Sequence, residues 1–133
     1  MYSMQECCKM TGLKYDTLKY YCNQGLIPNV KRDKLNNYRV FDDNDINWIK
    51  SLTCLKKCDF SLKEIKKYIE LCMKGKETLA ERKSMLINQK KEIENKIKTL
   101  NETLAFIDWK TSLYNQFMSG EKEYYSYLIK TDK

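Results

Sequence analysis

The chain has 133 residues, and its 25 lysines and arginines outnumber 18 aspartates and glutamates, giving a net charge of +7 with no histidine. Without histidine, a carboxylate pair in a cleft-forming context or a glycine-rich phosphate loop, the sequence argues against an enzyme, and no cofactor is expected. The first residues are polar, no apolar run could span a membrane, and six cysteines lie in lysine-rich helical patterns, so we expect free thiols in the cytoplasm.

The positive charge is concentrated near the N-terminus. Residues 1–41 contain seven lysines and arginines against three acidic residues, whereas residues 75–133 contain eleven against nine. A basic excess at one end favours a polyanionic partner, because binding releases the counterions that surround it. We therefore expect double-stranded DNA to contact the N-terminal part of the chain.

Two short helices separated by a tight turn are predicted at the start of the chain. Ser3 is a suitable N-cap for a helix that extends to Met10, and residues 11–12 (Thr-Gly) form the turn. A second helix is predicted over residues 15–24, with Gly25 ending it. This is the arrangement of a helix-turn-helix motif, whose second helix enters the major groove of DNA.

The second helix has one apolar face and one face suited to DNA. Leu18, Tyr21 and Cys22 recur at helical spacing and are expected to face inward. The other face carries cations for phosphates and hydroxyl groups for base edges. The candidate DNA-contacting residues of this region are Lys14, Tyr15, Thr17, Lys19 and Tyr20.

Residues 29–41 are predicted to form a small hairpin, or wing. Turn-forming residues between Asp33 and Asn37 separate two short alternating runs. The alternative is a basic loop that contacts only solvent. The candidate phosphate-contacting residues of the wing are Lys31, Arg32, Tyr38 and Arg39.

Two further helices are predicted before a hinge at residues 74–76. Asp42 is an N-cap for the first, and Ser61 with Glu64 forms a capping box for the second, residues 62–73. With these helices, residues 1–74 make up a winged helix-turn-helix domain. The apolar stripe of the first helix consists of Ile46, Ile49, Leu52 and Leu55.

A long helix without glycine or proline is predicted from Thr78 to Met118. Its apolar residues repeat by heptads and form one seam, which a single helix cannot bury. The same helix of a second subunit is the simplest partner, so residues 75–120 are predicted to form a homodimeric coiled coil. The seam consists of Leu79, Leu86, Ile93, Ile97, Leu100, Leu104 and Ile107.

The remaining segment, residues 121–133, is rich in tyrosine. A last short helix between Glu121 and Lys130, folding back on the chain, is predicted there. The fold class is therefore mainly α, with a small β wing.

An ordered set of short motifs runs through residues 6–65. Its members are Glu6, 11–13 (TGL), 17–21 (TLKYY), 25–28 (GLIP), 37–41 (NYRVF), 45–46 (DI), Leu52 and 60–65 (FSLKEI). In this order and spacing, the sequence resembles the MerR family of transcription regulators. That resemblance implies a winged head, an antiparallel coiled coil and a homodimer on a pseudopalindromic operator, where distortion of the promoter lets RNA polymerase engage. The elastic cost of such DNA bending is about 1–6 kcal/mol.

Several positions depart from the family pattern. Lys19 stands where the family usually has arginine, so a bidentate contact is lost. Cys22 replaces a glutamate, and Asn37 replaces the glycine of the wing, although asparagine also tolerates positive φ. Residues 58–59 (Cys-Asp) replace a small residue followed by glycine.

Residues 45–82 resemble the AdhR/NmlR branch of the family, in which one cysteine of the third helix senses aldehydes or other electrophiles. That resemblance makes Cys54 the candidate sensor thiol and predicts a role in stress response. Lys50, Lys56 and Lys57 are near it in sequence, and neighbouring cations favour the reactive thiolate. The alternative is that Cys54 fills space in the core, as expected for Cys7, Cys8, Cys22 and Cys72. Cys58 is a candidate resolving thiol, although neighbouring turns of one helix give poor disulfide geometry.

Three alternatives concern the effector or the function. A non-covalent ligand could bind near the aromatic residues of the C-terminal segment, which are Trp109, Tyr114, Phe117, Tyr124, Tyr125 and Tyr127. A metal effector would need three or four ligands, but no cysteine follows Cys72. A coiled-coil adaptor that binds other proteins is the alternative of another class, and the basic wing argues against it.

Overall fold

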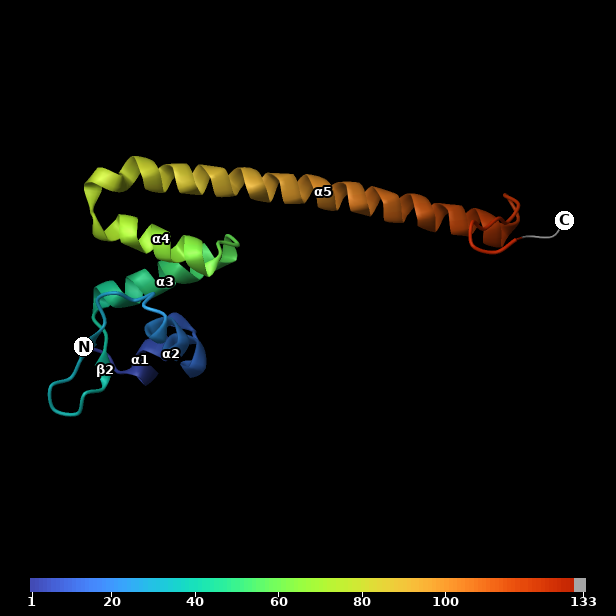
Figure 1. Ribbon diagram of the computed structural model, residues 1–133. Helices are drawn as coiled ribbons and strands as arrows, with labels where there is room; N and C mark the ends of the chain where they lie inside the picture. Colours follow the sequence, from blue (N-terminus) through green and yellow to red (C-terminus); the bar gives the residue numbers. More distant parts are fainter. Residues whose placement is uncertain (131–133) are drawn as a thin grey trace. The chain divides into compact units, whose positions relative to one another are not determined.

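The computed structural model describes residues 1–130, which divide into two compact units, residues 1–90 and the residues from 91 onward. Most helix ends lie within one residue of those predicted from the sequence. The elements are α1 (Met4–Thr11), α2 (Tyr15–Asn23), β1 (Lys31–Arg32), β2 (Arg39–Val40), α3 (Asp43–Lys57), α4 (Leu62–Met73), the 3-10 helix η1 (Lys76–Thr78) and α5 (Leu79–Ser119) (Figure 1).

Three helices of the first unit begin with a capping box. At α1 the Glu6 N–H donates to the Ser3 hydroxyl, and the Ser3 N–H donates to the Glu6 carboxylate, each at 3.1 Å. The same reciprocal pair starts α3, at Asp42 and Asp45, and α4, at Ser61 and Glu64. Each box satisfies two backbone donors that the first turn of a helix leaves without partners.

Helix α2 ends in a Schellman motif. The Gly25 N–H donates to the carbonyl of Cys22, and the Leu26 N–H donates to that of Tyr21. Gly25 has a φ of +73°, a conformation that costs glycine little. The motif turns the chain so that Leu26 enters the core beside Tyr21.

One hydrophobic core holds the head together. Its residues come from α1, α2, the segment after α2, α3 and α4, so it joins the helix-turn-helix to the two helices that follow. The predicted stripe of α3 is buried, and Leu55 retains the most exposure of the four, at 8%. The side chains with less than 2% exposure are Phe41, Leu18, Leu26, Ile27, Ile49, Leu52, Ile65 and Cys7.

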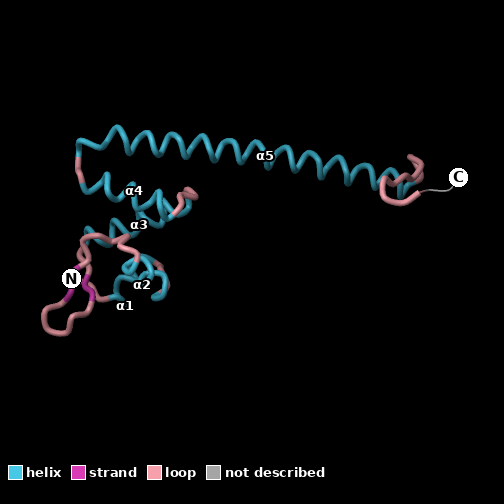
Figure 2. Tube along the Cα trace, in the orientation of Figure 1, coloured by secondary structure: helices cyan, strands magenta, loops and turns pink. Residues whose placement is uncertain are grey.

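The wing is a two-stranded antiparallel sheet in which Lys31 pairs with Val40 and Arg32 with Arg39. The loop that joins its strands is drawn in pink in Figure 2. Tyr2 and Phe41 form an additional antiparallel bridge. Since Phe41 is fully buried, this bridge attaches the base of the wing to the core.

The corner between α4 and α5 is held by Arg82 and Thr78. Thr78 is almost fully buried, and its hydroxyl is the donor to the carbonyls of Leu71 and Gly75. The Arg82 guanidinium donates to the Thr78 hydroxyl at 3.1 Å and to the Gly75 carbonyl at 2.8 Å. These bonds help to satisfy the Leu71 carbonyl, in the last turn of α4 where helical donors run out, and the Gly75 carbonyl in the turn that follows.

The predicted apolar seam of α5 is exposed in the single chain. Leu100 is 62% exposed and Leu104 58%. Ile93 is half-buried, and the other seam positions are exposed. An apolar seam that faces water on one chain has the pattern expected of a surface that another helix covers.

The prediction of a short helix between Glu121 and Lys130 is wrong, because residues 121–130 form bends and irregular structure. Gly120, with a φ of +80°, ends α5. The Ser126 hydroxyl then accepts bonds from the N–H groups of Leu128 and Ile129, and such local bonds compete with helix formation. Within residues 1–130, no helix is both long and apolar enough to cross a membrane.

Candidate nucleic-acid interface

Helix α2 presents the polar face that its sequence predicts. Leu18 and Tyr21 are buried, and Cys22 is half-buried. Lys14 occupies the N-cap position, where its ammonium group cannot cap the helix because it only donates hydrogen bonds. The residue is exposed, so this group can reach a phosphate. The candidate DNA-contacting residues of this helix are exposed at Lys14, Tyr15, Lys19 and Tyr20 and half-buried at Thr17.

A surface hollow of about 580 Å³ joins the helix-turn-helix to the wing. Four of the nine predicted DNA-contacting residues line it, whereas Lys14, Thr17, Lys19, Tyr20 and Lys31 do not. The start of α1 forms another part of its wall, which sequence reasoning did not include. The lining residues are Ser3, Met4, Gln5, Tyr15, Arg32, Tyr38 and Arg39.

Internal hydrogen bonds orient both arginines of this hollow. Arg39 Nη2 donates to Asn23 Oδ1 at 2.7 Å, which ties the wing to the end of α2. Arg32 Nη1 donates to the carbonyl of Asn37 at 2.9 Å, across the wing loop. Because a guanidinium has five N–H donors, each arginine keeps donors for a phosphate while its position is fixed.

The wing loop is shaped by short polar side chains. The Asp33 carboxylate accepts from the Leu35 N–H at 2.7 Å, and the Asn36 amide oxygen accepts from the Tyr38 N–H at 2.9 Å. Asn37 has a φ of +62°, a left-handed conformation that glycine favours and asparagine also tolerates. The phenol of Tyr38 is left exposed at the edge of the hollow.

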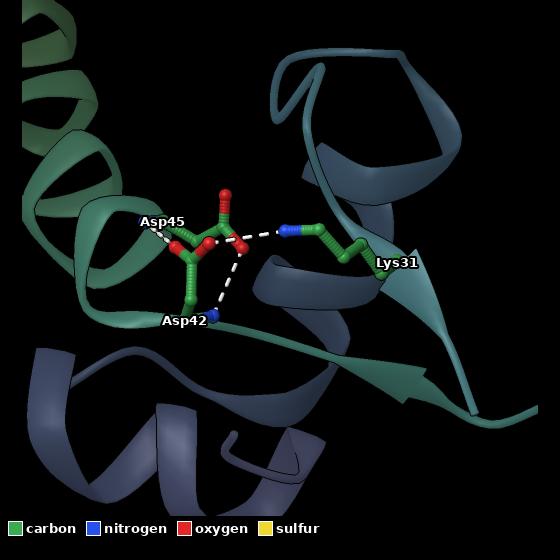
Figure 3. Close-up of polar contacts among 3 residues, drawn as sticks. All are labelled: Lys31, Asp42 and Asp45. Carbon is green, nitrogen blue, oxygen red and sulfur yellow. Dashed lines mark hydrogen bonds and ion pairs between the residues drawn. The ribbon is translucent and has the colours of Figure 1, made fainter.

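Lys31 differs from the other cations of the wing because an acid already binds it. Its Nζ lies 3.0 Å from Asp42 Oδ2, while Asp42 Oδ1 accepts from the Asp45 N–H (Figure 3). The Asp45 backbone bond, and then Lys31, lower the pKa of the Asp42 carboxyl, and the bond to Asp42 raises the pKa of Lys31. The pair is solvent-exposed, so its contribution to stability is modest.

The six cysteines are all free, but their surroundings differ. Cys54 is exposed on α3, whereas Cys7 is fully buried, and burial raises the pKa of the Cys7 thiol to about 12. Burial also raises the pKa of Cys8 and Cys22. The structure therefore makes Cys54 accessible and withdraws Cys7 from reaction with solutes.

Sequence reasoning missed the surroundings of Cys72, which it placed in the core. The Cys72 sulfur lies 3.8 Å from Arg82 Nη1, so the thiol is half-buried beside a cation of α5. The turn between α4 and α5 brings the two together, and no spacing pattern indicates that contact. Among the residues that the structure describes, no three metal-ligating side chains are grouped to hold a metal ion.

Known proteins resemble this chain over most of its length. Family models described as "MerR HTH family regulatory protein" and "MerR, DNA binding" match residues 2–72 and 47–109. An HTH-type transcriptional regulator of Haemophilus influenzae is 36% identical over 86% of this chain and 84% of its own. The transcriptional regulator AdhR of Bacillus subtilis is 33% identical over 68% of this chain and 64% of its own.

A crystal structure with the same fold contains DNA. It is that of HiNmlR, a MerR family regulator lacking the sensor domain, bound to promoter DNA. The TM-score is 0.68 at 35% identity, and the match covers 89% of this chain and 93% of that one.

Proposed function

Because this chain belongs to the MerR family of DNA-binding transcriptional regulators, and to its NmlR/AdhR-type branch, we propose that it binds a pseudopalindromic operator as a homodimer and controls transcription by distorting promoter DNA. Regulators of this family are DNA-binding proteins rather than enzymes. RNA polymerase at the promoter is the proposed downstream partner.

The hollow between α2 and the wing is the observation that carries this proposal. It places Tyr15, Arg32 and Arg39 on one surface, with the exposed Lys19 and Tyr20 on the same helix as Tyr15. In the proposed complex α2 lies in the major groove, and the wing contacts the phosphates of the flanking backbone. HiNmlR, which has the same fold, is bound to promoter DNA in its crystal structure, and this supports DNA as the partner.

The dimer is proposed from the exposed seam of α5. A helix of 41 residues spans about 60 Å at a rise of 1.5 Å per residue, long enough to pair with an antiparallel copy of itself. Covering the seam removes apolar side chains such as Leu100 and Leu104 from water. Two heads then bind two half-sites of one operator. The proposed boundaries are residues 1–74 for the head and 75–120 for the coiled coil.

Cys54 is the proposed sensor of electrophiles. Its thiol is exposed on α3, on the side of the head that the core does not occupy. With an aldehyde, the sulfur adds to the carbonyl carbon and the thiol proton passes to the oxygen, which gives a hemithioacetal. The added group increases the bulk of α3 and alters how the head holds distorted DNA.

Salt-dependent DNA binding tests the proposal. Duplexes are selected from a random library with the wild-type protein, and fluorescence anisotropy then measures affinity between about 50 and 200 mM salt. For a protein with six or more phosphate contacts, we expect affinity to fall by about a thousandfold or more over this range. Lys19→Ala should weaken binding and reduce the salt slope.

Lys98→Ala is the matched control, because Lys98 is an exposed lysine of α5 outside the proposed interface. Equal losses in the two variants, or binding without salt dependence, would contradict a DNA-binding head. Such a result would favour the adaptor that binds other proteins.

A further inference from the structure

An aromatic pocket of about 450 Å³ is formed within the second unit by the end of α5 and the segment that follows it. Its size falls within the range of about 300–1,000 Å³ that is typical of small-molecule sites. The side chains that line it are Trp109, Lys110, Leu113, Tyr114, Phe117, Tyr124, Tyr125, Ser126, Tyr127 and Leu128.

The pocket is built by specific packing. Leu113 is 4% exposed, and it is the one residue that is buried among residues 91–130, the described part of the second unit. Phe117 meets Tyr124 and Tyr125 edge-on, with ring centroids 5.3 and 5.2 Å apart, and this holds the segment after Gly120 against the helix. The Lys122 N–H also donates to the carbonyl of Gln116 at 3.1 Å.

Lys110 gives the pocket a positive charge. Its Nζ lies 5.8 Å from the ring centroid of Trp109 and 5.5 Å from that of Tyr114. Among the described residues that line the pocket, no carboxylate is present to neutralise it. The aromatic faces and one ammonium group complement a flat ring that carries an acidic group.

Most of the pocket lies on a different face of α5 from the apolar seam. At about 100° per residue, Leu113 and Phe117 lie largely opposite Leu100 and Leu104 around the helix axis, whereas Tyr114, one heptad after Ile107, lies on the seam side. A second copy that pairs along the seam therefore leaves the face with Leu113 and Phe117 open. This open face favours a small molecule over the partner helix as the occupant.

We propose that this pocket is a binding site for a planar aromatic anion, whose ring stacks among Trp109, Tyr114 and Tyr124 while Lys110 pairs with its carboxylate. Binding requires neither DNA nor the thiol of Cys54. A role for the site as a non-covalent effector site rests on the proposed function, but the experiment below does not depend on it.

The test uses 2-naphthoate and its uncharged analogue 2-naphthalenemethanol with the full chain. The chain has two tryptophans, so its NMR spectrum has two indole N–H signals, which Trp109→Phe assigns. We expect 2-naphthoate to shift the Trp109 signal and to leave that of Trp48 unchanged. Lys110→Met should weaken 2-naphthoate binding about tenfold, the loss of one charge-assisted bond, without weakening that of the alcohol.

Lys98→Met, an exposed lysine elsewhere on α5, is the control and should bind 2-naphthoate as the wild type does. Equal affinities for the acid and the alcohol, or an unshifted Trp109 signal, would overturn the proposal. If 2-naphthoate does not bind and Tyr124→Ala raises the fraction of monomer in analytical ultracentrifugation, a second copy occupies the pocket and the inference is wrong.

Discussion

Arg39 links the wing to α2, and this single side chain determines how the two parts of the interface are aligned. Its bond to Asn23 fixes the guanidinium beside Tyr38 and Arg32 at the same hollow. A preformed donor loses little conformational entropy when it contacts a phosphate. The orientation of Arg39 in the wing therefore depends on Asn23 of α2, for which no contact with DNA is proposed.

Replacing Arg39 or its partner Asn23 tests this dependence. Arg39→Ala should lower operator affinity about tenfold or more, because a charge-assisted phosphate contact contributes about 1.5–3 kcal/mol. Asn23→Ala should cause a smaller loss, since the guanidinium remains but is no longer oriented. Anisotropy measures affinity, and thermal unfolding verifies that each head is folded. Unchanged affinity in both variants would remove the wing from the interface.

The thiols are predicted to react in order of exposure. Brief treatment with iodoacetamide at pH 8, followed by peptide mapping, should label Cys54 first and Cys7 last. With its pKa raised to about 12, Cys7 is thiolate in roughly one molecule in ten thousand at pH 8.

Cys54→Ser should keep operator binding and lose the response to a small aldehyde. A full response in that variant would place the sensor elsewhere.

Residue identities that depend on local spacing were predictable, whereas contacts across a turn were not. The capping box at Ser61, the N-cap at Asp42 and the positive φ of Asn37 follow from rules that act within a few residues. The pairing of Lys31 with Asp42, and of Cys72 with Arg82, depends on where the chain folds back. The sequence therefore identified the wing cations without showing that one of them is already paired.

At the scale of elements, Asp42 both starts α3 and fastens β1 to it. Asp42→Asn keeps a good N-cap and loses the ion pair with Lys31, whereas Asp42→Ala loses both. We expect Asp42→Ala to lower the Tm by a few degrees, and Asp42→Asn by less. Similar losses in the two variants would show that the ion pair outweighs the cap.

Acid should remove the contribution of the Asp42 carboxylate to stability. Folding lowers the pKa of the Asp42 carboxyl, so its stabilising effect is present above the pKa of unfolded aspartate, about 4. It is lost as the pH falls through the lower pKa of the folded state. Thermal unfolding followed by circular dichroism at pH 7 and pH 2 should therefore show that the gap between wild type and Asp42→Ala narrows in acid. A gap of constant size would exclude the carboxylate as its cause.

Helices α1 to α5 were predicted more closely than the segment that follows α5. Helical periodicity and caps define α1 to α5, and glycine or asparagine marks the turns. The error at Glu121–Lys130 arose because tyrosine spacing there suited a helix, while Ser126 and the ring contacts of Phe117 stabilise an irregular fold. Side chains that pack on a neighbouring element override local propensity.

The whole molecule is expected to depend on a second copy, because the head alone buries its own core while α5 leaves its seam in water. Leu100→Glu places a carboxylate in the middle of that seam. Burying it against an antiparallel copy would require desolvation of a charge without a partner. The variant should therefore be monomeric at concentrations where the wild type is a dimer, as measured by analytical ultracentrifugation.

Operator affinity should fall when the dimer is lost. A monomer contacts one half-site, so the gain from binding two linked half-sites is lost, and this gain reaches about a hundredfold or more. Asn95→Glu is the matched control, since Asn95 is exposed and lies two residues, or about 200°, from the seam residues Ile93 and Ile97 on either side. It adds the same charge to the opposite face of α5, and it should leave both the dimer and the operator affinity intact. If both variants stay dimeric, α5 does not pair through this seam, and the two heads would have to be joined by another surface. If Leu100→Glu is monomeric but binds the operator at full affinity, the protein acts on a single half-site and the pseudopalindrome is not required.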